Sequence, residues 1–299
     1  MELSWLMRLR IAAAAAVGVF LLGFLAWPLV APAEPLSVVS TIATSFTDKV
    51  VLVVLACLAG FVSYFLAWPY GRQIAVLAVP SGLAVWVIRS GNMASLMLQN
   101  PTVAQRQEVF ASLRWEPIFW LALVAAGLGS SFLAEKIRKA AQPGEVEEKS
   151  NSPKNIYLNA VFALVGSGLV AQLCIRLFAR DISFSDSKLG SVIAQPEPGQ
   201  IIFAVSASFL IAAFVVKKFL SASYVWPIAA SAMVTWFAMT THCRQDILQH
   251  IQTHWPAVFF PSSTVAISPL QMVAFGALGS VAGYWLAVRY DYWHKYELK

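Results

Sequence analysis

Eight long apolar runs, separated by polar or basic segments, dominate the pattern of hydrophobic and polar positions along this chain. A helix needs roughly 20 apolar residues, with a range of about 17–25, to cross the hydrocarbon core of a bilayer. No Asp or Glu lies inside any of the runs. The pattern predicts an all-α fold, a polytopic bundle of about eight transmembrane helices, at residues 11–31, 50–69, 73–89, 117–134, 156–178, 200–216, 222–241 and 270–289.

The first run also has features of a secretory signal peptide. Arg8 and Arg10 precede it, and Ala31-Pro32-Ala33 follows it as an A-x-A cleavage pattern. The run is, however, longer than the usual signal core of roughly 7–15 residues. It also has a counterpart in the second half of the chain, so we expect it to be retained as the first transmembrane helix.

The loops between the runs repeat in the same order, which predicts an internal duplication. In each half a long loop, a tight turn and a second long loop follow one another. Because four helices return the chain to its starting side, the two copies would share one orientation, as in transporters built from parallel repeats. We predict a four-helix repeat at 1–134, a flexible cytoplasmic linker at 135–155 and a second repeat at 156–299. A shift of 150 residues aligns Gly127-Leu128-Gly129-Ser130 with Ala277-Leu278-Gly279-Ser280, and Trp86 with Trp236.

The formal net charge of +6 is best explained by membrane topology. Most basic residues lie on the side of the two termini, and the tight turns near 70–72 and 217–221 carry only basic charges. The positive-inside rule therefore places both termini in the cytoplasm, for a protein of the bacterial inner membrane. No clustered basic face is visible, so we expect the lipid bilayer as a partner and no nucleic acid.

Few polar side chains lie within the apolar runs, and none is a carboxylate. Ion-coupled transporters usually bury such groups in the membrane, so their absence from the runs argues against ion coupling. If the two repeats enclose a solute cavity at their interface, we expect its lining to include five residues of the third and seventh helices: Ser81, Trp86, Ser231, Thr235 and Trp236.

A second polar cluster is predicted in the exterior loops. His250 and His254 are four residues apart and would share one helix face, where they could bind a metal together with His242 or Cys243. The alternative, which we favour, is an interfacial amphipathic helix without a metal. Glu116 opens the fourth helix, where a carboxylate favours the helix dipole or serves as a gating or substrate carboxylate. The cluster comprises Glu116, His242, Arg244, Asp246, His250 and His254.

These features favour a non-catalytic membrane subunit or scaffold, associated with partner membrane subunits or with copies of itself. We find no paired catalytic carboxylates, no H-E-x-x-H sequence and no Gly-rich phosphate loop, and we expect no catalytic residue and no cofactor. Glycines at close-packing spacing, such as Gly279 and Gly283, agree with a framework. The alternatives are a transporter or channel for a neutral or lipophilic solute, and a membrane enzyme that uses the exterior histidines.

Overall fold

The eight apolar runs all fall on helices in the computed structural model, which describes residues 4–32, 34, 37–41, 44–141 and 156–296. The first two-thirds of the bundle is built from five helical stretches. They are α1 (Trp5–Gly18) with the π-helical η1 (Val19–Leu25) and the short α2 (Trp27–Val30), α3 (Phe46–Leu66), α4 (Gly71–Ile74) with the 3₁₀ turn η2 (Ala75–Leu77) and α5 (Ala78–Arg89), α8 (Glu116–Ala141) and α9 (Ile156–Phe178). Three more follow: α10 (Pro198–Leu220), α11 (Val225–His242) and α13 (Pro269–Tyr296).

Seven helical spans among the described residues are long and apolar enough to cross a membrane. The chain is therefore a mostly helical, multi-pass membrane protein. The seventh predicted helix forms as α11, but α11 is not among the seven spans. Its 18 residues end in Thr240, Thr241 and His242, and they do not reach the apolarity that defines the seven spans. The predicted number of eight membrane-crossing helices is thus not confirmed.

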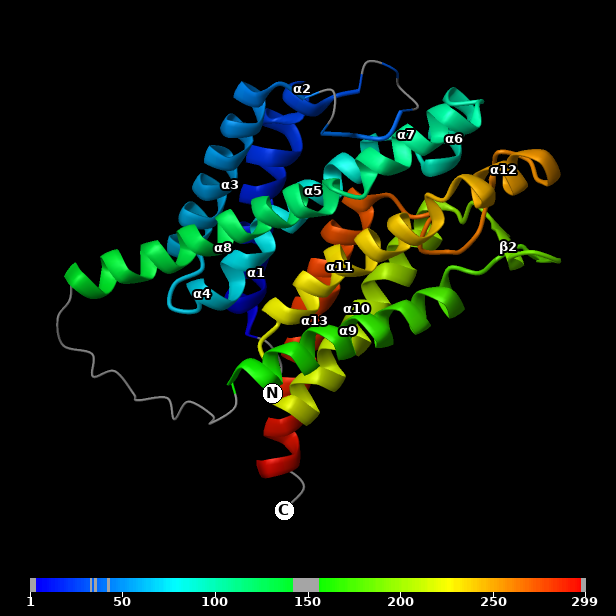
Figure 1. The fold of residues 1–299 in the computed structure, drawn as a ribbon. Helices are drawn as coiled ribbons and strands as arrows, with labels where there is room; N and C mark the ends of the chain where they lie inside the picture. The colour runs from blue at the N-terminus through cyan, green and yellow to red at the C-terminus, as the bar shows by residue number, and fades with distance from the viewer. Residues whose placement is uncertain (1–3, 33, 35–36, 42–43, 142–155, 297–299) are drawn as a thin grey trace.

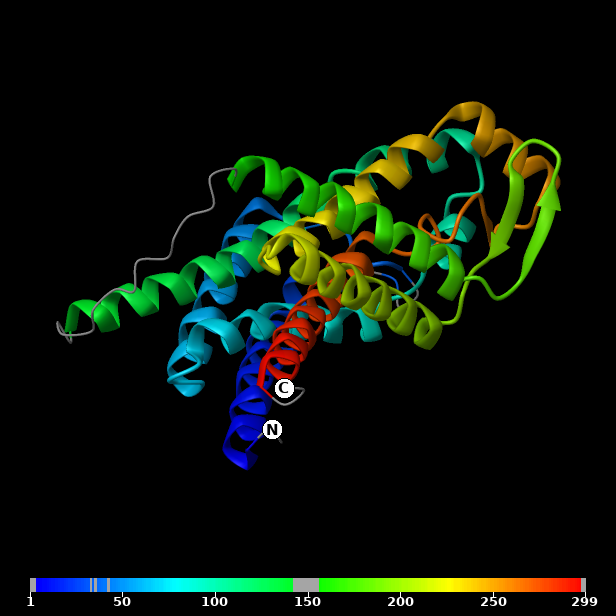
Figure 2. The same cartoon turned by 90° about the horizontal axis from the view of Figure 1, so that it is seen from below.

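The two ends of the bundle differ in structure. The beginning of α1 and the end of α13 lie at the same end (Figure 1). At the other end, which we call the outer end, the chain forms three short helices and a small sheet (Figures 1 and 2). These elements are α6 (Met93–Gln99), α7 (Val103–Leu113), α12 (Gln245–His254), β1 (Ser183–Asp186), β2 (Gly190–Ala194) and β3 (Phe259–Phe260).

The sheet was not predicted from the sequence. Its strands are antiparallel in the order β1-β2-β3, with Phe184 opposite Val192 and Ile193 opposite Phe260. Strands this short show too little alternation to be recognised by pattern.

The linker predicted at 135–155 does not begin at residue 135, because α8 continues to Ala141. Residues 142–155 lie outside the described residues.

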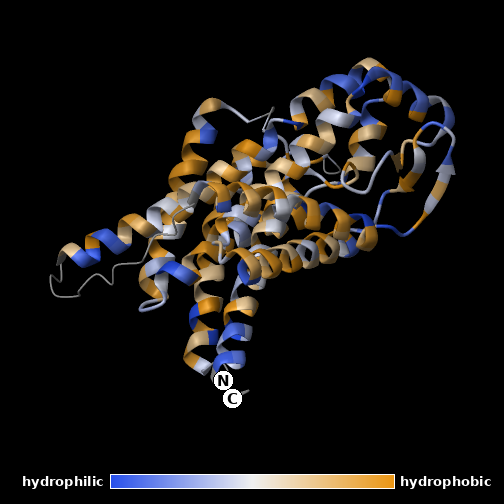
Figure 3. Ribbon diagram, turned by 60° about the horizontal axis from the view of Figure 1, so that its bottom comes forward, coloured by the Kyte–Doolittle hydropathy of each residue, from blue (hydrophilic) through white to orange (hydrophobic). Residues whose placement is uncertain are grey.

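Polar and apolar residues separate along the bundle (Figure 3). Apolar residues cover most of the helical surface, whereas polar residues gather at the outer end and in the last turns near the termini. This distribution suits a bilayer, where every helix face that meets lipid must be apolar.

The centre of the bundle is α13, which packs against α10, α11, α5 and α8. Its glycines allow backbones to touch. A Cβ added to Gly283 would lie 2.1 Å from the carbonyl oxygen of Leu210, and one added to Gly279 would lie 2.3 Å from that of Ser206. The close-packing role predicted for these two glycines is therefore confirmed.

Candidate functional site

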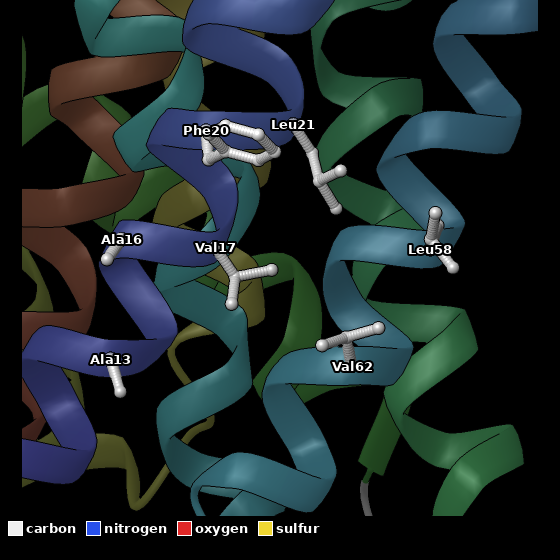
Figure 4. A pocket seen from close by; sticks show the side chains of 7 residues that line it. All are labelled: Ala13, Ala16, Val17, Phe20, Leu21, Leu58 and Val62. Carbon is white, nitrogen blue, oxygen red and sulfur yellow. The ribbon is translucent and has the colours of Figure 1, made fainter.

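Two hollows on the described part of the chain differ in their chemistry. The first lies on the side of the bundle between α1, η1 and α3 and has a volume of about 500 Å³. Figure 4 shows its lining, which is apolar throughout and suits a lipid chain rather than chemistry. The lining residues are Ala13, Ala16, Val17, Phe20, Leu21, Leu58 and Val62.

The second hollow, which we call the outer-end pocket, is chemically richer. It has a volume of about 440 Å³ and lies between α6, α7 and the described residues from Val30 to Ser40. One part of its wall is apolar, with Val30, Pro32, Val38, Leu96, Val109 and Leu113. The other part is polar, with Glu34, Ser37, Ser40, Gln99 and Asn100.

Hydrogen bonds connect the polar side chains of this pocket. The Gln99 Nε2 donates to Glu34 Oε2 at 2.8 Å, and the Ser37 hydroxyl donates to Gln99 Oε1 at 2.9 Å. The Asn100 Nδ2 donates to the carbonyl oxygen of Leu96 at 2.9 Å. The polar wall is therefore an ordered network, which joins the loop after α2 to the end of α6.

Glu116 lies behind this wall, at the start of α8. Its side chain is buried, with 2% of the residue exposed. The Ser40 hydroxyl and the Thr41 backbone N–H both donate to its Oε1, the latter at 2.9 Å. Its Oε2 is buried without a hydrogen-bond partner, as is the Nε1 of Trp120 one turn further along α8. Ser40 thus links the pocket to a buried carboxyl group.

The sequence singled out Glu116 but not the pocket beside it. The contact between Ser40 and Glu116 joins residues 76 positions apart, and no periodic pattern marks such a contact. The available signal was the length of the loop after the first helix, since long loops in compact proteins often carry function.

The other residues of the predicted exterior cluster gather around α12, whereas the hydrogen bonds of Glu116 go to Ser40 and Thr41. Arg244 Nε lies 3.8 Å from Asp246 Oδ1, and the rings of His250 and His254 stack at 4.5 Å. His242 Nδ1 lies 2.9 Å from the carbonyl oxygen of Ala238, in its own helix.

His250 contacts Asp186 of the hairpin, a residue that the sequence did not single out. His250 Nε2 lies 2.9 Å from Asp186 Oδ2, and the Trp255 Nε1 donates to the same oxygen at 2.8 Å. The indole of Trp255 above all, aided by His250 and the amides of Leu189 and Lys188, holds the pKa of Asp186 well below its usual range. The Asp186 clamp, as we call these contacts, fastens the hairpin to the end of α12, and Figure 2 shows the two elements side by side.

No group of three His, Cys, Asp or Glu side chains is placed to hold a metal ion within the described ranges. Of the predicted histidine pair, His250 makes a structural contact with Asp186. No third ligand for a metal ion lies beside the pair on the part of the chain that the structure describes.

The five residues predicted to line a solute cavity do not line either hollow. Ser231 and Thr235 are fully buried, and their hydroxyls donate to carbonyls of their own helix, at 2.6 and 2.9 Å. Trp86 is also fully buried, Ser81 is half-buried, and Trp236 is 39% exposed. A cavity lined by these residues stays a prediction.

Comparison with known proteins leaves the function to be inferred from the geometry alone. No protein-family model matches the chain, and no curated protein or solved structure matches it.

Proposed function

We propose that this protein is a non-catalytic membrane subunit or scaffold, a fixed framework of helices that binds partner membrane subunits or further copies of itself. The observation that carries the proposal is the closed packing around α13. A Cβ added to Gly276 of α13 would lie 2.8 Å from Cβ of Ser231 in α11. Ser231 and Thr235 are fully buried and their hydroxyls donate to carbonyl oxygens of their own helix, so neither side chain faces an open passage for a solute.

A duplicated architecture is part of this proposal. In the first half α3 packs on α8, where a Cβ on Gly60 would lie 2.1 Å from the Gly127 carbonyl oxygen. In the second half α10 packs on α13 through Gly283 and Leu210. Leu210 stands 150 residues after Gly60, at the shift that aligns the two halves. A close contact in each half thus uses corresponding positions of α3 and α10, although the partners Gly127 and Gly283 do not correspond, and the shared positions support two related four-helix units.

The proposed setting is the bacterial inner membrane, with both termini in the cytoplasm. Basic side chains such as Arg8, Arg72, Lys217 and Arg289 belong to the turns and helix ends on the side of the termini. Positive charge at this end favours the cytoplasmic face.

Purification of the tagged, full-length protein from its own membranes in mild detergent tests the scaffold proposal. We expect stable co-purification of other subunits in fixed ratio, or a defined homo-oligomer, that withstands washing with high salt. A large exposed apolar face on α9, for example at Leu169 and Leu173, offers a matched pair of variants. Changing both residues to Ala tests whether partner binding uses this face, whereas changing the exposed Val50 and Val54 of α3 to Ala serves as a control on another helix.

Isolation of a lone monomer carrying a specific bound solute would contradict the scaffold and support the alternative, a transporter or channel for a neutral or lipophilic solute. The outer-end pocket is the observation that favours this second candidate. Uptake measured in liposomes containing the purified protein distinguishes the two, since a scaffold gives no uptake above protein-free vesicles.

A further inference from the structure

The hydrogen bonds of the outer-end pocket determine which polar atoms a ligand would meet. A carboxylate oxygen can only accept, so the amide nitrogen of Gln99 must face Glu34. The Gln99 oxygen then faces Ser37, whose hydroxyl must donate its only proton to it. Ser37 therefore keeps only lone pairs for any other partner.

Asn100 and Glu34 also bring acceptor oxygens to the pocket. The carbonyl oxygen of Leu96 can only accept, so the amide nitrogen of Asn100 faces it and the amide oxygen stays available as an acceptor. Glu34 accepts one hydrogen bond on Oε2 and is exposed at the rim. Ser37 and Glu34 thus present only acceptors, Asn100 presents its amide oxygen beside a second N–H, and no Lys or Arg is among the described lining residues.

The electrostatic character of the pocket agrees with this pattern. Glu34 lies on the rim, and the carboxyl of Glu116 lies behind Ser40, with its Oε2 buried and unpartnered. Arg106, the buried basic residue of α7, is directed to the end of α6, where it donates to the carbonyl oxygens of Asn100 and Met97. The carboxylate of Glu34 at the rim, with no basic side chain among the described lining residues, favours a ligand that brings positive charge and hydrogen-bond donors.

We propose that the outer-end pocket binds a small amphipathic amine. Its ammonium group donates to Glu34 and to the acceptor oxygens of Ser37 and Asn100, and its hydrocarbon part lies against Leu96, Val109 and Leu113. The volume of about 440 Å³ lies in the usual range of roughly 300–1,000 Å³ for small-molecule sites. This binding function goes beyond the scaffold role and does not depend on it.

Titration of the purified full-length protein with hexylamine, compared with hexanol, tests the proposal. Calorimetry or the shift in thermal unfolding reports binding, and the two probes differ in charge at equal chain length. We expect hexylamine to bind at least about tenfold more tightly than hexanol, because a charge-assisted contact to Glu34 contributes about 1.4 kcal/mol or more. If the two probes only partitioned into the detergent, the unchanged protein and all variants would give the same signal. That result would overturn the proposal.

Two variants separate the charge of the site from its shape. Glu34→Gln keeps the hydrogen bond from Gln99 but removes the charge, and we expect it to lose the preference for the amine. Glu197→Gln, an exposed carboxylate at the same end outside the pocket, is the matched control and should bind as the unchanged protein does. Val109→Trp should fill the pocket and abolish binding of both probes. Equal binding by the Glu34→Gln variant and the unchanged protein would refute an ammonium site here.

Discussion

The indole nitrogen of Trp86 donates a 2.7 Å hydrogen bond to the carbonyl oxygen of Leu22. Trp86 belongs to α5, and Leu22 lies in η1, where the backbone is a π-helix rather than an α-helix. The Trp86 ring also contacts Trp120 of α8 edge to face, with 6.1 Å between the ring centroids. One side chain therefore joins three helices in the core beside Glu116.

Replacing Trp86 by Phe should lower the stability of the protein. The change removes the donor to the Leu22 carbonyl and leaves a gap where the larger ring was, and the lost hydrogen bond alone costs about 1 kcal/mol. The midpoint of thermal unfolding in detergent measures the effect. Trp236→Phe is the control, because Trp236 is 39% exposed and its replacement should change the midpoint little. If both variants changed the unfolding midpoint equally, the Trp86 contact would not be a specific source of stability.

Gly283→Ala should destabilise the protein by forcing α13 away from α10. A new Cβ would lie 2.1 Å from the Leu210 carbonyl oxygen, a backbone atom that cannot move aside alone. Overpacking of this kind costs about 1–3 kcal/mol. Gly129→Ala provides the matched control, since its Cβ would meet nothing within 4 Å and alanine favours a helix by up to about 1 kcal/mol. Thermal unfolding of both variants should shift in opposite directions.

Asp186→Asn should release the hairpin from α12 without unfolding the bundle. The clamp depends on a charged carboxylate, and Asn accepts from Trp255 and His250 more weakly. Hydrogen exchange measured by mass spectrometry should rise across residues 183–194 and stay unchanged in α13. Asp181→Asn, an exposed carboxylate just before β1, should leave the exchange pattern as it is.

The same clamp should respond to acid. The fold lowers the pKa of Asp186, so the charged form is favoured in the folded protein. A lowered folded pKa means that the stabilisation is fully present above the ordinary value of 3.8 and is lost as the pH falls through the lowered one. The contribution of the Asp186 charge should therefore be constant down to about pH 4, and hydrogen exchange of the hairpin, after correction for intrinsic rates, should increase at lower pH.

The first helix should be retained in the mature protein. Cleavage after Ala33 would remove Leu22, the acceptor of Trp86, and Gly18, whose added Cβ would lie only 1.7 Å from the Ala78 carbonyl oxygen. Peptide mapping of the purified protein by mass spectrometry should recover peptides that precede Ala33. A species shorter by the first 33 residues would identify the run as a signal peptide instead.

Reporter fusions test the proposed orientation. A fluorescent protein fused after Lys299 should fluoresce, and alkaline phosphatase at the same position should be inactive, because both would lie in the cytoplasm. Phosphatase fused after Asn100, in the segment between α6 and α7, should be active. The reverse pattern would show that both termini lie outside the cytoplasm and would contradict the orientation assigned by the positive-inside rule.

The sequence by itself determined where the helices lie. Apolar runs of membrane-spanning length can satisfy their backbone hydrogen bonds in lipid only as helices, so all eight runs became helices, although α11 is less apolar than the spans around it. Glycine spacing likewise predicted the close approach at Gly279 and Gly283, because the absence of a side chain is a local property.

The tertiary structure decided the candidate site. Ser40 and Glu116 are 76 positions apart, and Asp186 and His250 are 64 apart, so neither contact could be read from local spacing. The sequence grouped Glu116 with the exterior histidines because all were polar residues outside the membrane. Packing separated them: Glu116 was buried behind the loop after α2, and His250 was turned toward the hairpin. Which polar groups meet depends on how the helices pack, and the chain's apolar pattern specifies burial but not these pairings.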